Sequence, residues 1–440
     1  MLNAYNIIAK KRDGLEITPD EIKWFITALL QGEVADYQMS ALLMAIYLNG
    51  FSTRETSALT DAMLYSGETI SFPDKFFVDK HSTGGIGDKT SFILGPIAAA
   101  CGVKVPMIAG RGLGHTGGTV DKIESIKGFN TNLSLDKFKT MVTEKGLSLI
   151  GQTGEIAPAD KIIYGLRDVT ATIESIPLIT ASIMSKKLAE GARGIVMDIK
   201  VGNGAFMTKK TQARKLAKSI RDTGLRFDRN MMTVISDMNQ PLGNAVGNSL
   251  EIIESIETLK GNGPKDLTDL SLHLAGGMVY IGGLAKSHQA GIRKAKEALK
   301  SGAALQSFRE LLRNQGGDEK VVDDYGLLPL AAHHHVVTAN RTGFISKIKS
   351  TQIGLHVVSL GGGRAKASDK IDFGVGMTFH KKLGQKVNEG EPILTIHHNK
   401  GQDKIVSSIA DSLLGKDISF SKQKPTNLSP LIYETETSWC

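Results

Sequence analysis

The chain has 440 residues, of which 41% are hydrophobic, enough for a large buried core and two or three domains. Its 48 glycines and its low aromatic content of 6% suit an α/β enzyme with many tight turns. Two cysteines, Cys101 and Cys440, cannot form a disulfide framework, so the reducing cytoplasm is the expected location.

The formal net charge of +8 is spread thinly along the chain. No basic stripe with interleaved aromatic residues accompanies it, which argues against a nucleic-acid partner. A mildly basic surface fits a small anionic substrate equally well, so charge alone does not decide the matter. The longest uncharged run, residues 90–103, is shorter than the roughly 18 residues of a membrane span, and the N-terminus lacks a signal-peptide pattern. We therefore expect no membrane partner.

The first 66 residues predict a small all-helical domain. Capping boxes at Thr18–Glu21 and Ser52–Glu55 mark the starts of two helices. Residues 39–48 between them are almost wholly apolar and end at Asn49-Gly50, a helix stop signal. A helix that is apolar all round is normally buried on every side. We therefore expect either an internal core or a homodimer interface formed by these helices.

From residue 70 the pattern changes to strand, glycine loop and helix. The predicted strands occupy residues 76–79, 103–108, 195–201 and 232–236. This alternation predicts an α/β fold with a mainly parallel sheet, here over residues 70–335. Residues 158–190 return to a helical pattern, which indicates an insertion that belongs to the helical domain.

Residues 340–440 predict a C-terminal α+β part. The stretch from residue 343 to residue 397 is strand-like, with glycine turns. Segments 383–387 and 390–396 resemble the hairpins of biotinyl/lipoyl-type β-sandwich domains, so we expect a barrel-sandwich-like arrangement. No lysine stands there between two methionines, and a swinging-arm function is therefore not expected.

Two glycine-rich loops predict a phosphate site. In the first, Lys80 to Gly85, a cation, an imidazole and two hydroxyls precede the helix predicted from Ser91. Backbone N–H groups at such a helix start attract an anion through their geometry and dipole. An ordinary strand-to-helix turn would explain the first loop alone, but a second donor-rich loop, Gly110 to Thr119, favours phosphate.

The second loop also matches the dinucleotide-binding pattern G-x-G-x-x-G at residues 112–117, so an oxidoreductase is the competing class. The match does not open directly into a helix after the first strand of its domain, and no clear ribose-binding acid ends a following strand. Thr116 and Thr119 indicate hydroxyls that face a ligand instead. The absence of tight NAD binding would separate the two classes.

A third group pairs Tyr164 with Arg167 and Ser182 with Lys186, each pair on one helix face. A guanidinium, a hydroxyl and an ammonium beside apolar side chains can hold a flat ring that bears carbonyls. A solvated charged face is the alternative, and it explains isolated Arg and Lys residues on helices more often.

Six motifs place these residues in a wider pattern. They are residues 78–88 (VDKHSTGGIGD), 110–122 (GRGLGHTGGTVDK), 156–161 (IAPADK), 167–172 (RDVTAT), 175–182 (SIPLITAS) and 197–202 (MDIKVG). Together they resemble the thymidine/pyrimidine-nucleoside phosphorylase family, and residues 261–264 and 316–324 resemble its broad-specificity bacterial branch. The resemblance extends from the first helix to residue 434, which is essentially the full length.

The resemblance implies phosphorolysis of pyrimidine nucleosides (thymidine, deoxyuridine or uridine) to the free base and α-D-(deoxy)ribose 1-phosphate. It implies inorganic phosphate contacts from Lys80, Ser82, Ser91 and Thr119. Substrate contacts are expected from Met107, Tyr164, Arg167, Ser182 and Lys186. The catalytic residues would be His81, Arg167 and Lys186.

The expected chemistry agrees with these residue types. Negative charge grows on the departing pyrimidine, where Arg167 and Lys186 can stabilise it as preorganised donors. His81 is suited to protonate the leaving base or to hydrogen-bond it. Phosphate is already a good nucleophile, so no cofactor is expected to be required. The family architecture implies a homodimer in which the ligands bind between the helical and α/β domains, with domain closure.

The chain departs from the family at three positions. Ala109 stands where the family usually has a phosphate-binding serine, and Met107 where the broad-specificity branch typically has lysine. Met107 offers no strong hydrogen bond to a ribose 2′-hydroxyl, which favours 2′-deoxynucleosides. Lys89 replaces a threonine that helps to bind a potassium ion in the pyrimidine branch.

By resemblance, the shell of that ion corresponds to Gly87, Lys89, Leu242, Ala245 and Glu254. We expect one of three arrangements. The Lys89 ammonium occupies the ion site and pairs with Glu254; or Lys89 points to solvent and the ion is lost; or K⁺ remains with the four other residues and water as ligands.

Two other functions are weighed against phosphorolysis. A phosphoribosyltransferase of related fold, such as the anthranilate-specific type, needs magnesium and diphosphate binding, and no acidic pair for that metal is evident. A binding protein without activity is the non-enzymatic alternative, and the intact set of polar residues argues against it.

Overall fold

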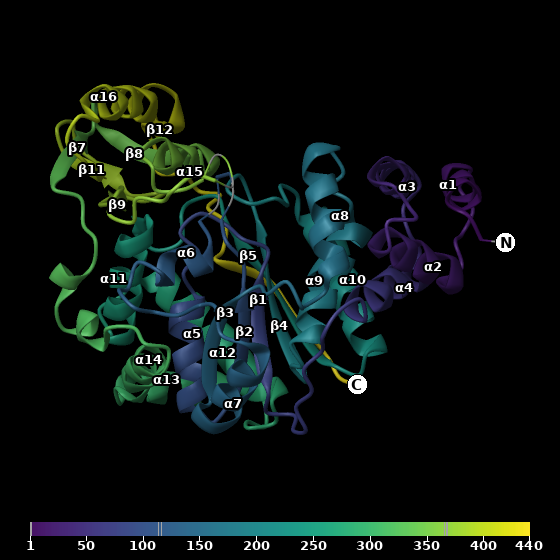
Figure 1. Ribbon diagram of the computed structural model, residues 1–440. Coiled ribbons are helices and arrows are strands. Elements are labelled where there is room, and N and C mark those ends of the chain that lie inside the picture. The colour runs from purple at the N-terminus through teal and green to yellow at the C-terminus, as the bar shows by residue number, and fades with distance from the viewer. Residues whose placement is uncertain (1, 113, 116, 365, 367) are drawn as a thin grey trace.

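The computed structural model describes residues 2–112, 114, 115, 117–364, 366 and 368–440. Thr116, predicted to face a ligand, lies outside the described residues. The predicted fold class is confirmed: a helical domain, a larger α/β domain and a C-terminal α+β part follow one another (Figure 1). Within the described part of the chain, no helix is long and apolar enough to cross a membrane.

The helical domain combines the N-terminal helices with a later pair. Its helices are α1 (Ala4–Arg12), α2 (Pro19–Leu30), α3 (Asp36–Asn49), α4 (Thr53–Leu64), α8 (Pro158–Val169) and α9 (Ile176–Ala189). Both predicted capping boxes form, at Thr18 and Ser52. Ile163 of α8 and Leu178 of α9 lie in the same core as Phe25 of α2, so the segment predicted as an insertion does pack with this domain.

Helix α9 belongs to two cores at once. Leu178 and Ala181 in its first half pack in the helical core, whereas Met184 and Leu188 in its second half pack in the α/β core. Figure 1 shows α8 and α9 between the N-terminal helices and the central sheet. The helix that carries Ser182 and Lys186 is therefore anchored on both sides.

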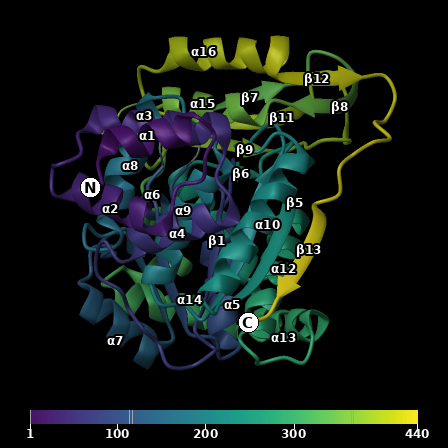
Figure 2. The ribbon, with the colours of Figure 1, turned by 90° about the vertical axis from the view of Figure 1, so that its right-hand side faces the viewer.

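The central sheet has the order β1 (Val78–Ser82), β4 (Gly194–Val201), β5 (Asn230–Asp237) and β13 (Ile432–Ser438). The first three strands are parallel, as predicted, and β13 runs antiparallel to β5 along the sheet edge (Figure 2). The segment predicted for the C-terminal part therefore ends with a strand that returns to the α/β sheet. Strands β2 (Val105–Ala109) and β3 (Leu147–Gly151) form a separate parallel pair.

Helices cover both faces of the central sheet. Those on one face include α5 (Ser91–Ala100) and α12 (Lys265–Ile281), and α10 (Lys210–Arg226) lies on the other with α9. The remaining helices of this domain are α6 (Thr119–Ile123), α7 (Leu135–Lys145), α11 (Asn248–Leu259), α13 (His288–Lys300) and α14 (Ala303–Asn314), followed by 3₁₀ turns at Glu319–Val322 and Tyr325–Leu327.

The C-terminal part contains two small sheets. One has the order β6 (Ala245–Val246), β9 (Gly376–Phe379), β11 (Pro392–His398) and β7 (His333–Thr338); the other has the order β10 (Lys386–Val387), β8 (Gly343–Ile348) and β12 (Ile418–Ser421). Because β6 comes from the α/β domain, its pairing with β9 joins the two parts of the chain.

Two sequence-based expectations for this part are corrected. The strand-like stretch contains a helix, α15 (Ser350–Ser359), because Ile353 and Val357 are four residues apart and bury one helical face despite their β-branched side chains. The two segments expected to form a hairpin lie in different sheets, as β10 and β11. Helix α16 (Asp403–Ser412) and a π-helical turn, Leu413–Asp417, precede β12.

Candidate active site

Strand β1 distributes its side chains over the two faces of the central sheet. Successive residues of a strand point to opposite faces. Asp79 therefore faces α9, where it binds Lys187, whereas Lys80 and Ser82 face the glycine loop, where they bind Thr90 and Asp88. His81 shares the face of Asp79.

The glycine-loop face forms the predicted phosphate half of the site. Lys80 Nζ donates to Thr90 Oγ1 at 2.7 Å, and Ser82 Oγ donates to Asp88 Oδ2 at 2.5 Å. Ser91 is the first residue of α5. An anion placed at these donors competes with the Asp88 carboxylate for them.

Asp88 is held ionised by the lysines around it. Burial disfavours its charge, but Lys80, Lys200 and the Ser82 hydroxyl outweigh burial and keep the pKa of Asp88 well below its usual range. Lys80 Nζ lies 4.0 Å from Asp88 Oδ1, and Lys122 Nζ donates to the Asp88 carbonyl at 2.8 Å. Two of these lysines also have other carboxylate partners: Lys122 pairs with Glu251 and Lys200 pairs with Asp198.

The second glycine loop lies on the same side. Thr119 begins the short helix α6, and Asp121 of that helix accepts hydrogen bonds from Gly112 N at 2.7 Å and from Arg364 Nη1 at 2.8 Å. The first bond ties the start of the loop to α6, and the second ties α6 to the C-terminal part. Residues 113 and 116 of the dinucleotide-type match lie outside the described residues.

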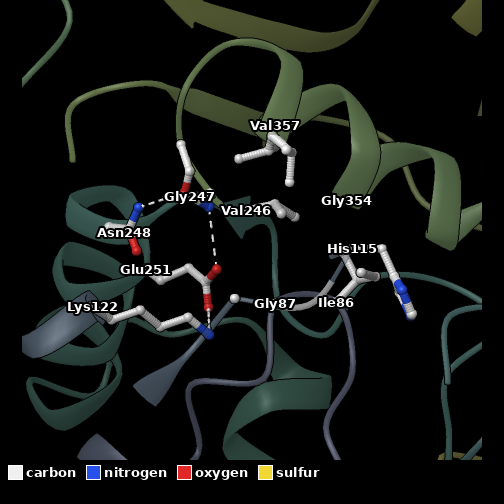
Figure 3. A pocket seen from close by; sticks show the side chains of 14 residues that line it. Ile86, Gly87, His115, Lys122, Val246, Gly247, Asn248, Glu251, Gly354 and Val357 are labelled. Atoms are coloured by element: carbon white, nitrogen blue, oxygen red, sulfur yellow. Dashed lines mark hydrogen bonds and ion pairs between the residues drawn. The ribbon is translucent and has the colours of Figure 1, made fainter. Parts of the chain in front are cut away.

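A small cavity of about 20 Å³ lies behind these loops (Figure 3). Its lining includes Gly87, Lys122, Asn248 and Glu251, and Lys122 Nζ lies 2.7 Å from Glu251 Oε2. A space of this volume holds about one water molecule, so it is far too small for a nucleoside. The cavity lies between the glycine loops and the C-terminal part, which contact each other directly beside it through bonds such as Gly114 N to Arg364 O at 3.2 Å.

The α9 side forms the predicted base half of the site. Lys186 Nζ donates to Ser182 Oγ at 3.0 Å and pairs with the Asp160 carboxylate of α8. Asp160 is 2% exposed, so this ion pair holds the ammonium against a fixed partner. Sequence reasoning placed Ser182 and Lys186 together but missed Asp160.

Arg167 is buried and joins α8 to the segment before α9. Its guanidinium donates to three main-chain carbonyls, those of Thr172, Ile173 and Leu178, at 3.4, 2.7 and 3.1 Å. Tyr164 lies one turn earlier, with its ring centroid 5.8 Å from the guanidinium carbon. Three contacts of this kind hold the planar group in one orientation and use three of its five N–H donors.

His81 lies where the two halves meet. Burial, Lys187, Lys186 and Lys80, in that order, lower its pKa well below 6.5, and Asp88 opposes them only weakly. The imidazole is therefore uncharged at neutral pH and offers one N–H donor.

Met107 and Ala109, which both lie on β2, differ in their exposure to solvent. Met107 is 2% exposed and packs in the α/β core against α5, whereas Ala109 is partly exposed at the end of β2. Ala109 therefore stands at the mouth of the second glycine loop without a hydroxyl to offer.

Lys89 has no exposed surface and is surrounded by oxygen atoms. Its Nζ donates to Leu242 O at 3.0 Å, Ala245 O at 2.8 Å and Glu254 Oε2 at 2.5 Å. Gly87 has φ +73°, and a Cβ there would lie 2.6 Å from Leu242 O, so only glycine fits beside this group. The ammonium thus takes up the oxygens of Leu242, Ala245 and Glu254, three of the four residues that the resemblance assigns to an ion besides Lys89.

Several charged residues of the site were missed at the sequence level. They are Asp79, Asp88, Asp160, Lys187, Glu190 and Lys200. Most of them lie inside or beside the quoted motifs, so their position in those motifs could have indicated that they belong to the site. Their partners lie 26 to 108 residues away in cases such as Lys186–Asp160 and Lys187–Asp79, which no local spacing rule reveals.

Family comparisons match three successive parts of the chain. Residues 5–67 match the helical bundle domain of a glycosyl transferase family, and residues 74–305 match its a/b domain. Residues 344–413 match the pyrimidine nucleoside phosphorylase C-terminal domain.

Curated relatives are similar over nearly the full length. The pyrimidine-nucleoside phosphorylase of Staphylococcus epidermidis is 47% identical over 432 residues, which cover 98% of this chain and 99% of that protein. The Bacillus subtilis pyrimidine-nucleoside phosphorylase is 47% identical over 411 residues, covering 93% and 95%. Among solved structures, anthranilate phosphoribosyltransferase from Thermus thermophilus shares the fold, with a TM-score of 0.59 at 18% identity over 70% of this chain and 99% of that one.

We predict that His81 titrates below the usual histidine value of about 6.5 in the ligand-free protein. The unfolded chain then binds more protons than the folded chain just below pH 6.5, so this group lowers the free energy of unfolding as the pH falls through that range. NMR titration measures the midpoint, with the signal assigned by its loss in His81→Asn and the urea-unfolded chain as reference. A midpoint above 6.5 would contradict the prediction.

Proposed function

The chain belongs to the pyrimidine-nucleoside phosphorylase family, and from this premise we propose how its site cleaves pyrimidine nucleosides with inorganic phosphate. The products are the free base and a (deoxy)ribose 1-phosphate, so the enzyme is a pentosyltransferase. The observation that carries the proposal is the alternation along β1. It sets Lys80 and Ser82 toward the phosphate loop and His81 toward Lys186 and Lys187.

The phosphate half would bind the nucleophile. Lys80 and Ser82 supply charge-assisted hydrogen bonds, and the N-terminus of α5 at Ser91 adds backbone N–H groups and a favourable dipole. Thr119 would complete the shell from the second loop. Because Asp88 already engages Ser82, phosphate binding requires that this hydroxyl turn from the carboxylate to the ligand.

The base half would stabilise the leaving group. As the glycosidic bond breaks, negative charge spreads over the pyrimidine ring and its carbonyl oxygens. Lys186 and Arg167 are fixed in place before the reaction, by Asp160 and by main-chain carbonyls, so they need little reorganisation to meet that charge. Their stabilisation is larger for the charged leaving base than for the neutral nucleoside, which is what lowers the barrier.

His81 would act between the two halves. In the free enzyme the imidazole is uncharged and serves as a hydrogen-bond donor. A bound phosphate dianion adds negative charge close to it and raises its pKa, which favours transfer of a proton to the departing base. Phosphate binding and proton donation are then linked.

We predict that Arg167→Ala and Lys186→Ala each lower kcat/KM by about 10²–10³, because each removes a preorganised donor. Release of uracil or thymine, followed with and without phosphate, measures the reaction. Arg214→Ala, at a side chain that is 56% exposed, is the matched control and should retain the rate. Near-normal kinetics in Arg167→Ala would contradict the role of this residue. Base release at the same rate with and without phosphate would contradict phosphorolysis.

We propose that no free potassium ion is needed, because the Lys89 ammonium replaces it. Lys89 already uses the oxygens of Leu242, Ala245 and Glu254, so the residues present do not fit an additional ion. A second ammonium, Lys382, donates to Pro241 O and Gly243 O at 2.5 Å each. The carbonyls of this loop are therefore engaged from two sides by side chains.

We predict that the wild-type rate is the same in potassium and in tetramethylammonium buffers. In Lys89→Thr the site left by the ammonium keeps its carbonyl oxygens and the Glu254 carboxylate, so it can bind potassium. Both kcat/KM and the melting temperature should therefore become dependent on potassium concentration. Lys218→Thr, on the exposed face of α10, is the control. Wild-type activity that collapses without potassium would refute the replacement.

We propose a homodimer formed through the N-terminal helices. Neighbouring helices α1 and α3 carry a set of exposed apolar side chains: Tyr5, Tyr37, Met44, Tyr47 and Leu48. Leu48 is 72% exposed, whereas Leu43 and Ile46 on the opposite side of the same helix are buried in the domain core. A patch of this kind on a single chain is typical of an interaction surface.

We predict that Leu48→Glu shifts the mass measured by sedimentation from dimer to monomer at micromolar concentration. Leu428→Glu, at an exposed apolar residue of the C-terminal part, should leave the mass unchanged. A monomeric wild-type chain at that concentration would contradict the proposal.

A further inference from the structure

Three ionisable side chains lie buried beneath the site, outside the groups that would bind ligands. Asp79 of β1, Lys187 of α9 and Glu190 at the end of α9 are 0 to 3% exposed. Lys187 Nζ donates to Asp79 Oδ2 at 2.6 Å, to Glu190 Oε2 at 2.9 Å and to Ile108 O at 3.0 Å. An ammonium has three N–H donors, so all of them are used.

The group contains two acids and only one base. With both carboxylates ionised, it would carry one uncompensated negative charge in the interior, which is strongly unfavourable. The other two carboxyl oxygens, Asp79 Oδ1 and Glu190 Oε1, have no hydrogen-bond partner among the described residues. The Asp79 and Glu190 side chains lie within hydrogen-bond reach of each other, so one proton between them would remove the excess charge and give the unpaired oxygens a partner.

We propose that Asp79 and Glu190 share one proton, and that the resulting neutral Asp79–Lys187–Glu190 group positions α9 against β1 and β2 for the reaction. The proposal rests on the proposed function, because the elements that it joins carry the base half and the phosphate half of the site. The three residues are positioning residues, since they act through Lys186 and His81 rather than on the ligands.

Electrostatics agree with a proton on the pair. Burial and Asp79 raise the pKa of Glu190 well above its usual range, and Lys187 offsets them only in part. Burial disfavours the charged form of Lys187, but Asp79 and Glu190 outweigh it and raise the pKa of this ammonium. The group at neutral pH is thus one ammonium, one carboxylate and one carboxylic acid, in which the proton belongs to the pair.

Each contact of Lys187 reaches an element that carries a residue of the site. Asp79 precedes His81 by two residues on the same face of β1, and Ile108 precedes Ala109 at the mouth of the second glycine loop. Lys187 itself follows Lys186 on α9. One ammonium therefore sets the separation between the leaving-group donors and the phosphate-binding strand.

The shared proton also bears on the charge of His81. This imidazole is faced by Lys187 and Lys186 from α9, by Lys80 from β1 and by Asp88 from the glycine loop. Loss of the proton would give the buried group a net negative charge, which would oppose the effect of Lys187 and favour a charged imidazole. The neutral group keeps His81 uncharged until phosphate binds.

Infrared spectroscopy of the whole enzyme at pH 7 tests the shared proton without reference to activity. A carboxylic acid has a C=O stretch that a carboxylate lacks. We expect such a band to move in D₂O and after ¹³C labelling of aspartate and glutamate carboxyl groups, and to be lost in Glu190→Gln. A wild-type spectrum that shows no band removed by this substitution would overturn the proposal.

Kinetics test the positioning role. Glu190→Ala removes the proton bridge and one anchor of Lys187, so kcat should fall about tenfold or more, with a smaller change in KM, because small misplacements of catalytic groups are costly. Glu190→Gln mimics the protonated acid: its amide N–H can donate to Asp79 and its oxygen can accept from Lys187. It should restore most of kcat and keep the acid limb of the kcat/KM profile in place. Lys218→Ala controls for the loss of a side chain elsewhere.

Two outcomes would contradict the positioning role. Either Glu190→Gln is as slow as Glu190→Ala, or its acid limb moves to lower pH, as expected if a buried negative charge had been removed. Failure of the wild-type enzyme to release base with phosphate would refute the proposed function instead. The infrared band would still report on the proton in that case, so the two failures are distinguishable.

Discussion

Parallel pairing of β1 with β4 fixes the direction of every side chain in the segment from Asp79 to Ser82, and the rest of the site follows from it. Alternation sends Lys80 and Ser82 to one face and Asp79 and His81 to the other. The phosphate loop covers the first face and α9 covers the second. A register shift of one residue would exchange the two sets, placing Lys80 and Ser82 against α9 and the imidazole in the glycine loop. In the proposed site, β1 thus separates the phosphate half from the base half.

The electrostatics of the site come from buried lysines rather than from the net charge of the chain. Lys80, Lys89, Lys122, Lys187 and Lys200 are each at most 3% exposed, and each has a carboxylate partner. Burial of a charge is tolerated only with such a partner, so every lysine also fixes the segment that supplies its acid. Around Asp88 the three nearby lysines, Lys80, Lys122 and Lys200, are each matched by a carboxylate. An anionic ligand therefore has to take over hydrogen bonds that the protein now makes to Asp88.

The sequence predicted the architecture and the local structure around the proposed site residues, and it failed where a contact is made by distant residues. The glycine loops, the start of α5 at Ser91 and the pairing of Ser182 with Lys186 all depend on local spacing, and they were predicted. Helix α15 was missed because β-branched residues are frequent in both strands and buried helices. Asp160 and Glu190 were missed because their roles depend on tertiary contacts that no motif spacing encodes. The position of Met107 in the core likewise depends on the packing of α5 over β2 rather than on its own type.

A tethered ammonium and a free ion differ in a way that bears on how the phosphate loop is held. The occupancy of an ion site depends on the ion concentration. The Lys89 ammonium is covalently attached to the chain, so its effective concentration at the site is high and does not change. Its bonds to Leu242 and Ala245 therefore form as part of folding and add to the stability of the loop under any ionic conditions. Ala245 lies in β6, which pairs with β9, and Lys382 holds the same loop from the C-terminal part. The conformation of the phosphate loop is consequently coupled to the docking of the C-terminal part, which contributes no predicted ligand contact of its own.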